Sequence, residues 1–483
     1  MAPSLTEAWL SRFGDSDALS RRMEWDGLSA ADFAELPARL LHDLCGSARR
    51  AEAALRRRDP VAADAVLTAL DRDAVQDAPL ARLLDLPPDI AALRSLAREA
   101  ACAGGPVQMA LGRVSLAHGI AALEEARQRL RRDAPALLQR FGFQADVLRV
   151  VEAVGDPHAN GRRVLRFEDA EGRAVYLKPR PLDGERVLDR LALMLGAEGK
   201  GIRLPKMLAR ARYGWVAEAR PADATALRSA GALIAVADLA AAVDLHKENL
   251  MPVAAGVSIL DGEMALHPDL PLSLVPIEAH AAALRLRSGV LRTGLLPEPA
   301  QPHDLCGLAA WGAAARMTQE DAAEVCEGYA QALAHLCAKG GARAALERAL
   351  PARGVVRLLL RRSAGYGRLL ERMRDPRATP HAQTLLLHLD ALRIGMTRSH
   401  RKKPILWGVA AAETAALLRG DIPRLWMAWD DHGVWEGDGH NAPCALMANT
   451  PRSAALLRAA QFEPDRATKQ ARVIRKVWTH GSG

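Results

Sequence analysis

The sequence is poor in aromatic residues and has no long apolar run. Phe, Trp and Tyr make up 4% of its 483 residues, and no basic segment is interleaved with side chains that could stack on bases. We therefore do not expect nucleic-acid binding. The longest apolar run, AGALIAVA, ends before Asp238 and is far too short to cross a bilayer, so we expect no membrane span.

Cysteine is also sparse. None of the six cysteines forms a C-x-x-C pair, and MAPSLTEAWLSRFGDSD has no recognisable signal peptide, which indicates reduced thiols and a cytoplasmic location. The sequence HDLCG occurs twice, around Cys45 and Cys306. Its His-x-x-Cys spacing supplies two metal ligands, whereas structural zinc needs four, so we interpret the repeat as chance.

The rest of the composition is that of a folded, basic protein. Hydrophobic residues make up 49% and charged residues 25%, which indicates a globular chain long enough for several domains. Lys and Arg number 65 against 57 Asp and Glu, giving a net charge of +8. A solvated basic face explains this excess most simply, and an acidic peptide or a nucleotide partner is the alternative.

Hydrophobic periodicity divides the chain into three parts. Residues 1–143 have a helical pattern and predict a helical N-terminal capping region. Residues 144–226 are rich in strand signals and predict a lobe of β-hairpins. Residues 227–483 are mostly helical, beginning with a helix over 227–246 and a short strand pair around GVSILDGEMAL (256–266). The sequence therefore predicts an α+β fold.

Four polar residues occur in an order that suits phosphoryl transfer. Lys178 ends an apolar strand, AVYLK, Asp244 and Asn249 belong to DLHKEN, and Asp261 follows in LDGE. Phosphoryl transfer needs a cation on the phosphates, a carboxylate that orients or deprotonates the attacking hydroxyl, and oxygen ligands for Mg²⁺. These residues supply those parts in the order found in kinases. The alternative is separate structural roles at a helix end, a turn and the start of a hairpin.

A G-x-G-x-x-G phosphate loop is absent, so this hypothesis needs another turn to cover the phosphates. The candidate is GDPHANG, which carries Asp156 and His158 shortly before Arg162 and Arg163. Taken alone, this segment is typical of a polar hairpin turn.

A third polar set lies in VVRLLLRRSAGY and consists of Arg357, Arg361, Arg362, Ser363 and Tyr366. Arg357 and Arg361 are four residues apart and share one face if the segment is helical. Guanidinium groups bind phosphate in a bidentate manner. A kinase needs few such groups, but an enzyme that recognises a phosphorylated product and expels its phosphate needs them.

Together these motifs resemble the dehydratase portion of class II lanthipeptide synthetases, the LanM type. The resemblance covers about residues 150–427 and is carried by GDPHANGRRV, VYLKPRPL, DLHKEN with LDGE, SGVLRTGLLP, RLLLRRSAGY and ETAALLRGDIP. It implies a lipid-kinase-like, two-lobed fold with a helical N-terminal region and a predominantly helical C-terminal lobe. It also implies a ribosomally made precursor peptide with a leader segment as the partner. Such enzymes phosphorylate Ser and Thr with ATP and Mg²⁺, then eliminate phosphate to give dehydroalanine or dehydrobutyrine.

The resemblance implies roles for particular residues. Phosphorylation would use Lys178, Asp244, His246, Asn249, Asp261 and Glu263. Of these, Lys178, Asn249, Asp261 and Glu263 would contact ATP, and Asn249 and Asp261 would bind Mg²⁺. Elimination would use Asp156, His158, Arg357 and Ser363, with Lys178 again. His158 and Asp156 are both candidates for moving the Cα proton, and the sequence does not choose between them.

The sequence departs from the family pattern at several points. Ser363 stands where Thr is usual, which keeps the hydroxyl, and Gly262 between Asp261 and Glu263 should loosen the strand there. The two Cys and one His of a cyclase zinc site do not follow Met427, so rings would require a separate cyclase or other tailoring enzyme. Two alternatives remain open: a peptide kinase that stops at phosphorylation, and a non-catalytic scaffold that binds the precursor.

Overall fold

The structure is a computed structural model that describes residues 106–196, 201–222, 227–253, 256–270, 289–297, 306–311, 318–361, 363–379, 384–385, 388–389, 405–437, 440–442, 447–462 and 465–479. Most of the expected N-terminal capping region, including Cys45, lies outside these residues, as does Arg362. Helices and strands both contribute extensively, so the predicted α+β class is confirmed.

The chain forms two compact units. The first comprises the described chain up to Pro179, together with Leu359–Leu425 and Val434–Cys444. The second comprises Arg180–Leu358, Trp426–Gly433 and the described chain after Ala445. The boundaries expected near residues 143 and 226 remain predictions.

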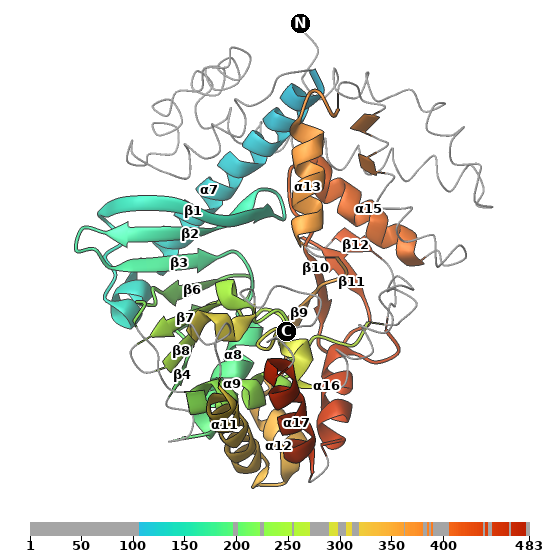
Figure 1. Ribbon diagram of the computed structural model, residues 1–483. Coiled ribbons are helices and arrows are strands. Elements are labelled where there is room, and N and C mark those ends of the chain that lie inside the picture. The colour runs from blue at the N-terminus through green and yellow to red at the C-terminus, as the bar shows by residue number, and fades with distance from the viewer. Residues whose placement is uncertain are drawn as a thin grey trace, which may run out of the picture. The chain divides into compact units, whose positions relative to one another are not determined.

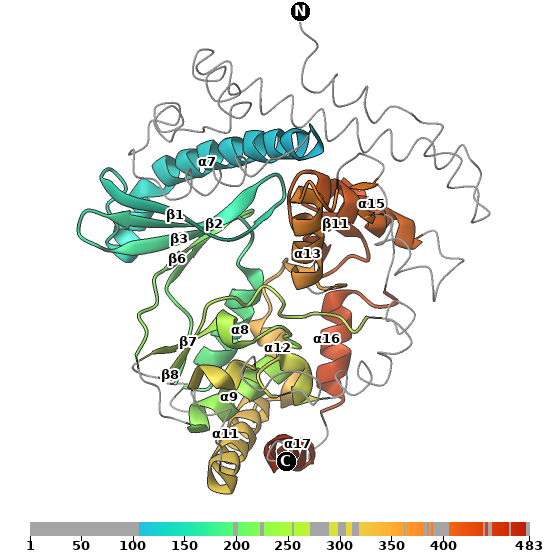
Figure 2. The same ribbon diagram turned by 45° about the horizontal axis from the view of Figure 1, so that its top comes forward.

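The first unit joins a long helix to an antiparallel sheet. Helix α7 (Pro106–Phe141) lies along strands β1 (Leu148–His158), β2 (Arg162–Asp169) and β3 (Ala174–Lys178), as Figures 1 and 2 show. The unit also contains α13 (Ser363–Arg374), α15 (Ile405–Leu418) and a hairpin of β11 (Val434–Glu436) and β12 (His440–Ala442). Burial of apolar side chains such as Leu111, Tyr366 and Met373 joins α7 to α13.

The second unit is mainly helical. Its helices are α8 (Asp183–Met194), α9 (Leu227–Leu239), α11 (Gln319–Cys337), α12 (Gly341–Ala349), α16 (Pro451–Ala460) and α17 (Arg466–Thr479), with short 3₁₀ helices η2 (Lys247–Asn249), η5 (Val290–Thr293) and η7 (Gly307–Trp311). Its strands are β4 (Ile202–Arg203), β5 (Met207–Ala209), β6 (Gly214–Ala217), β7 (Leu250–Val253), β8 (Gly256–Ile259) and β9 (Val355–Leu358). Strand β10 (Leu425–Ala428) begins at the boundary of the units. Strands β5 and β6 form an antiparallel hairpin, and β8 lies between parallel β4 and antiparallel β7.

Helix α9 is the buried centre of this unit, and α11 crosses it closely (Figure 1). Glycines make the close crossing possible: a Cβ at Gly231 would lie 2.1 Å from the backbone oxygen of Val325, and one at Gly328 would lie 2.2 Å from that of Arg228. At the end of α9, the fully buried carboxylate of Asp238 is held by three other helices.

Three partners hold that carboxylate. The hydroxyl of Tyr329 on α11 donates to Asp238 at 2.9 Å, Arg466 on α17 donates at 2.8 Å, and Arg458 on α16 also donates. Buried carboxylates need such partners because an unpaired charge in the interior is very costly. The two C-terminal helices are therefore fastened to α9 through one side chain.

Some sequence-based expectations were wrong. The helix expected over 227–246 ends at Leu239, because the backbone turns at Ala241, which has a φ of 48°. Arg357 and Arg361 do not share a helical face: Arg357 lies on β9, a short run with two β-branched valines, and Arg361 lies beyond its end. Strands β9 to β12 were not expected. Within the described ranges, no helix combines the length and apolarity that a bilayer crossing requires.

Candidate active site

The segment after α9 is a tightly held loop that carries Asp244. Its backbone is left-handed at this residue (φ 65°), which is uncommon for a residue with a side chain. The backbone nitrogen of Val243 donates to the oxygen of Met264 at 3.3 Å, and that of Leu245 donates to Thr293 at 2.8 Å. Backbone strain that the surroundings hold in place in this way is typical of functional sites.

Asn249 fixes this loop from within. Its Nδ2 donates to the backbone oxygen of Asp244 at 2.7 Å and lies 3.3 Å from Nε2 of His246. His246 is the N-cap of η2, where its Nδ1 accepts from the backbone nitrogen of Glu248 at 3.3 Å. The distance from His246 Nε2 to Asp244 Oδ1 is 3.8 Å, which is too long for a direct hydrogen bond. The structure thus brings the three predicted residues of DLHKEN together.

The electrostatic environment of Asp244 suits a proton acceptor. Burial raises the pKa of Asp244 above its ordinary value, and the charges of His246 and Arg357 oppose this rise. The nearby carboxylates of Glu263 and Asp261 add to it. A raised pKa makes a carboxylate a stronger base, and so better matched to accepting a proton near neutral pH.

Asp261 lies beyond the end of β8 and against Asn249. The backbone nitrogens of Leu260 and Asp261 donate to the backbone oxygen of Asn249, at 2.8 and 3.4 Å. The two predicted Mg²⁺ ligands are therefore on hydrogen-bonded segments. The Asp261 carboxylate accepts at Oδ1 from Arg180 at 2.6 Å and from the backbone nitrogen of Glu263 at 3.1 Å.

A buried network of arginines and carboxylates continues from Asp261. The Arg180 side chain is 2% exposed and donates to both oxygens of Glu185, at 2.6 and 3.1 Å. Its Nε lies 2.8 Å from Oε2 of Glu263, and the Oε1 of Glu263 accepts from Arg357 at 2.7 Å. Burial alone would lower the pKa of each arginine, but the carboxylates outweigh burial and raise it, so both stay charged.

The donor atoms in this region fit Mg²⁺. Asp261 offers a carboxylate and Asn249 an amide oxygen, and hard cations of this kind prefer oxygen ligands. Mg²⁺ commonly keeps several waters and substrate phosphate oxygens, so one or two protein ligands suffice. Groups of three or more His, Cys, Asp and Glu that could hold a metal are absent from the described part of the chain. Mg²⁺ held here would therefore rely on this pair of oxygens.

In the first unit, GDPHANG forms the end of β1 and the turn into β2. His158 is buried, and its Nδ1 lies 2.7 Å from the backbone oxygen of Ile422. A carbonyl oxygen can only accept, so Nδ1 carries the proton and the neutral ring has its acceptor lone pair on Nε2. Asp156, by contrast, is exposed.

Asp421 ties this turn to the loop after α15. Its carboxylate accepts from the backbone nitrogens of Asn160 and Gly161, at 2.7 and 2.9 Å, and from Arg419 at 3.2 Å. Ala159, Asn160 and Gly161 all have positive φ, which turns successive N–H groups toward one side, where a carboxylate can bind them. Two of the sequence motifs, GDPHANG and ETAALLRGDIP, therefore meet.

ETAALLRGDIP also meets RLLLRRSAGY. The fully buried Glu413 on α15 accepts from Arg361 at 3.1 Å and from the hydroxyl of Tyr366 on α13. Burial raises the pKa of Glu413, and Arg361 and Tyr366 partly offset the rise. Ser363 is the first residue of α13. Three motifs that are far apart in sequence thus converge in the first unit.

The predicted residues fall into two sets, one in each unit. The second unit holds Asp244, His246, Asn249, Asp261, Glu263 and Arg357, and hydrogen bonds connect all six. The first unit holds Asp156, His158, Lys178 and Ser363. Of these, Lys178 is the buried last residue of β3.

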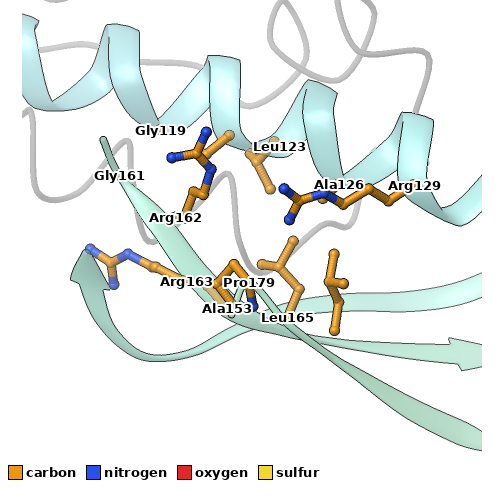
Figure 3. A pocket seen from close by; sticks show the side chains of 12 residues that line it. Gly119, Leu123, Ala126, Arg129, Ala153, Gly161, Arg162, Arg163, Leu165 and Pro179 are labelled. Carbon is orange, nitrogen blue, oxygen red and sulfur yellow. The ribbon is translucent and has the colours of Figure 1, made fainter. Parts of the chain in front are cut away.

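A pocket in the first unit lies between α7 and the sheet (Figure 3). Apolar side chains such as Leu123 line it together with Arg129, Arg162 and Arg163. Arg129 and Arg162 both pair with Glu125, at 2.5 and 2.6 Å, so one carboxylate faces two of these charges. None of the predicted site residues is among the residues that line this pocket.

Sequence reasoning missed Arg180, Glu185, Glu413 and Asp421. Arg180 stands between two prolines, and no local pattern indicates its partners. A usable signal existed for Glu413 and Asp421, because each is a single carboxylate close to a run of apolar residues, where a charge needs a partner. Glu185 had no comparable signal, since acidic residues are common in the first turn of a helix.

A family model matches the sequence over more than half of its length. The family is described as a domain of unknown function (DUF4135), and the match covers residues 106–321 and 314–427. The chain belongs to this family. DUF4135 is a domain found in LanM-type lanthipeptide synthetases. No curated protein matches the sequence. All residues of both sets lie within the DUF4135 match.

Proposed function

We propose that this DUF4135 protein is an ATP- and Mg²⁺-dependent dehydratase of a ribosomally made precursor peptide. It phosphorylates Ser and Thr and then eliminates phosphate to leave dehydroalanine and dehydrobutyrine. The observation that carries the proposal is the loop from Asp244 to Asn249: the backbone of Asp244 is left-handed, the pKa of its carboxyl group is raised by burial, and Asn249 is hydrogen-bonded to Asp261. The occurrence of DUF4135 in LanM-type synthetases supports it, and a lipid-kinase-like, two-lobed architecture belongs to the same proposal.

In the phosphorylation step, Asp244 takes up the proton of the Ser or Thr hydroxyl as that oxygen attacks the γ-phosphorus of ATP. The bond from this phosphorus to the bridging oxygen of ADP breaks. His246 lies beside Asp244, and its charge opposes the rise in the pKa of the Asp244 carboxyl group. Lys178 binds phosphate oxygens. Asn249 and Asp261 would hold Mg²⁺, which would supply positive charge that offsets the charge of the phosphates.

In the elimination step, a base removes the Cα proton. The electron pair of the Cα–H bond then forms the Cα–Cβ double bond, and the Cβ–O bond breaks as phosphate leaves. His158 fits the base, because the bond from its Nδ1 to Ile422 leaves the lone pair on Nε2. Asp156 is the alternative. The resemblance to LanM dehydratases supports roles in this step for Arg357 and Ser363, because a guanidinium group binds phosphate and a hydroxyl group can donate to it.

The proposal is tested by the mass of a precursor peptide encoded beside this protein and co-expressed with it. Loss of water with the wild-type protein is expected, and retained phosphate with Arg357→Ala. Phosphate gain alone with the wild type would favour a kinase that stops at phosphorylation. An unmodified peptide would favour a non-catalytic scaffold. Arg343→Ala removes an exposed ion pair with Glu347 on α12 and should leave dehydration unchanged.

A further inference from the structure

Arg180 takes no part in the reactions proposed above, yet it contacts two residues that do. It immediately follows the first unit along the chain and is buried, with 2% of its side chain exposed. Its guanidinium faces three carboxylates: Glu185 in the first turn of α8, Asp261 and Glu263. One cation thus joins a helix terminus to the segment that carries the proposed metal ligand.

The contacts on Asp261 fix how its carboxylate is turned. Arg180 and the backbone nitrogen of Glu263 both donate to the same oxygen, Oδ1, at 2.6 and 3.1 Å. Two donors on one oxygen prevent free rotation about the bond that carries the carboxylate. The side chain of Asp261 remains 29% exposed, so a ligand can reach it.

The backbone around this contact is closely packed. A Cβ at Gly184 on α8 would lie 2.1 Å from the backbone oxygen of Gly262, and a Cβ at Gly262 would lie 2.7 Å from Leu188. The segment from Asp261 to Glu263 is therefore packed against the start of α8. Glycine at position 262 allows this close approach, while its expected loosening of the strand remains a prediction.

The network has more carboxylates than arginines, so the positive charge of Arg180 is needed to limit repulsion among them. Two arginines, Arg180 and Arg357, face four carboxylates: Glu185, Asp244, Asp261 and Glu263. Without Arg180, Arg357 would be left to face Asp244, Asp261 and Glu263, and Glu185 would lose its contact with Arg180. Loss of the Arg180 hydrogen bond and repulsion among the carboxylates would then favour rotation of Asp261, which weakens a metal ligand.

We propose that Arg180 is a positioning residue of the Mg²⁺ site: it holds the proposed ligand Asp261 in the orientation that binds the metal, and Glu185 and Glu263 hold Arg180. This inference rests on the proposed function. Metal ligands are commonly oriented by such partners, whose removal typically weakens metal binding.

The test measures how much Mg²⁺ the full-length protein needs to bind ATP, by calorimetric titration at increasing Mg²⁺ concentration. Arg180→Gln should raise the Mg²⁺ concentration for half-maximal ATP binding by about 10-fold to 100-fold. Glu185→Gln acts through Arg180 and should give a smaller shift in the same direction. ATP binding without Mg²⁺ should stay as in the wild type.

Arg466→Gln is the matched control, because Arg466 is another largely buried arginine of the same unit, paired with Asp238, and Asp238 keeps Arg458 and Tyr329 as partners in this variant. It should lower thermal stability without changing the Mg²⁺ requirement. An equal shift in Arg466→Gln, or an unchanged requirement in the Arg180 and Glu185 variants, would overturn the inference and leave the proposed function standing. A wild-type protein that binds no ATP with Mg²⁺ would overturn both. If Arg180→Gln does not fold, the Mg²⁺ requirement of Glu185→Gln tests the inference.

Discussion

Asn249 donates a hydrogen bond from its side-chain amide to the backbone oxygen of Asp244, at 2.7 Å. The bond helps to hold Asp244 in a left-handed conformation (φ 65°). Asparagine adopts this conformation more readily than alanine does. Asp244→Asn should therefore keep the free energy of unfolding near the wild-type value, whereas Asp244→Ala should lower it by about 1 kcal/mol. Denaturant unfolding measures the difference.

Both Asp244 substitutions should also impair phosphoryl transfer. Each removes the carboxylate that we expect to accept the hydroxyl proton, and such groups contribute about 10²-fold to 10⁴-fold to a rate. The rate of phosphate incorporation into the precursor measures this loss. A folded Asp244→Asn protein with wild-type activity would show that Asp244 is not the base.

Glu413 should make stability depend on pH. Burial raises its pKa in the folded protein, so the folded chain binds more protons than the unfolded chain between the ordinary glutamate pKa and the raised one. The free energy of unfolding should fall as pH rises through that window, by at most about 1.4 kcal/mol per pH unit. Glu413→Gln should lack this component. Denaturant unfolding of both proteins at a series of pH values isolates it, and a difference that stays constant across the window would contradict it.

Removing Asp421 should destabilise the turn between β1 and β2. Its fully buried carboxylate binds two backbone nitrogens and Arg419. Asp421→Ala leaves the buried Arg419 and two partly buried backbone nitrogens with fewer partners and should lower the free energy of unfolding by about 3–5 kcal/mol. Asp465→Ala breaks an exposed pair with Lys469 and should cost less than about 1 kcal/mol. Similar losses in the two variants, measured by denaturant unfolding, would argue against a special role for Asp421.

Gly184→Ala should disturb the contact between α8 and Gly262. The added Cβ would lie 2.1 Å from a backbone oxygen that cannot easily move, so we expect a loss of about 1–3 kcal/mol in the free energy of unfolding. Gly365→Ala on α13 is the control, because a Cβ there meets nothing within 4 Å. It should leave stability unchanged or raise it by up to about 1 kcal/mol. Thermal or denaturant unfolding that ranks the two variants in the opposite order would contradict the packing argument.

Local signals in the sequence predicted part of this fold. Strand patterns identified β1, β2 and β3, and the polar residues of DLHKEN and LDGE stood out because they interrupt apolar surroundings. The structure brings those residues into contact, while their catalytic roles remain predictions. A signal that was not used lies in LWMAWDDHGVWEG, where aromatic residues flank a turn sequence and form β10 and β11.

The remainder could not be read from local patterns, because it depends on residues far apart in the chain. Asp421 and Asn160 are separated by 261 positions, and nothing near either one indicates the other. The local pattern of VVRL fits a helix and a strand equally well, and the tertiary contact of Arg357 with Glu263 helps to hold this segment extended as β9. The role of Arg180 likewise could not be predicted locally, because it depends on the tertiary contact with Asp261 next to α8.

Asp238 connects the far end of the chain to the candidate active site. It sits where α9 ends, and α9 leads directly into the loop that carries Asp244. A protein shortened before Arg458 would keep a buried carboxylate but lose both arginines that neutralise it. The Asp238 carboxylate would then have to move into water or take up a proton. Either change would displace the end of α9, where the loop begins. The C-terminal helices are remote from the loop in sequence, but they help to hold it in position.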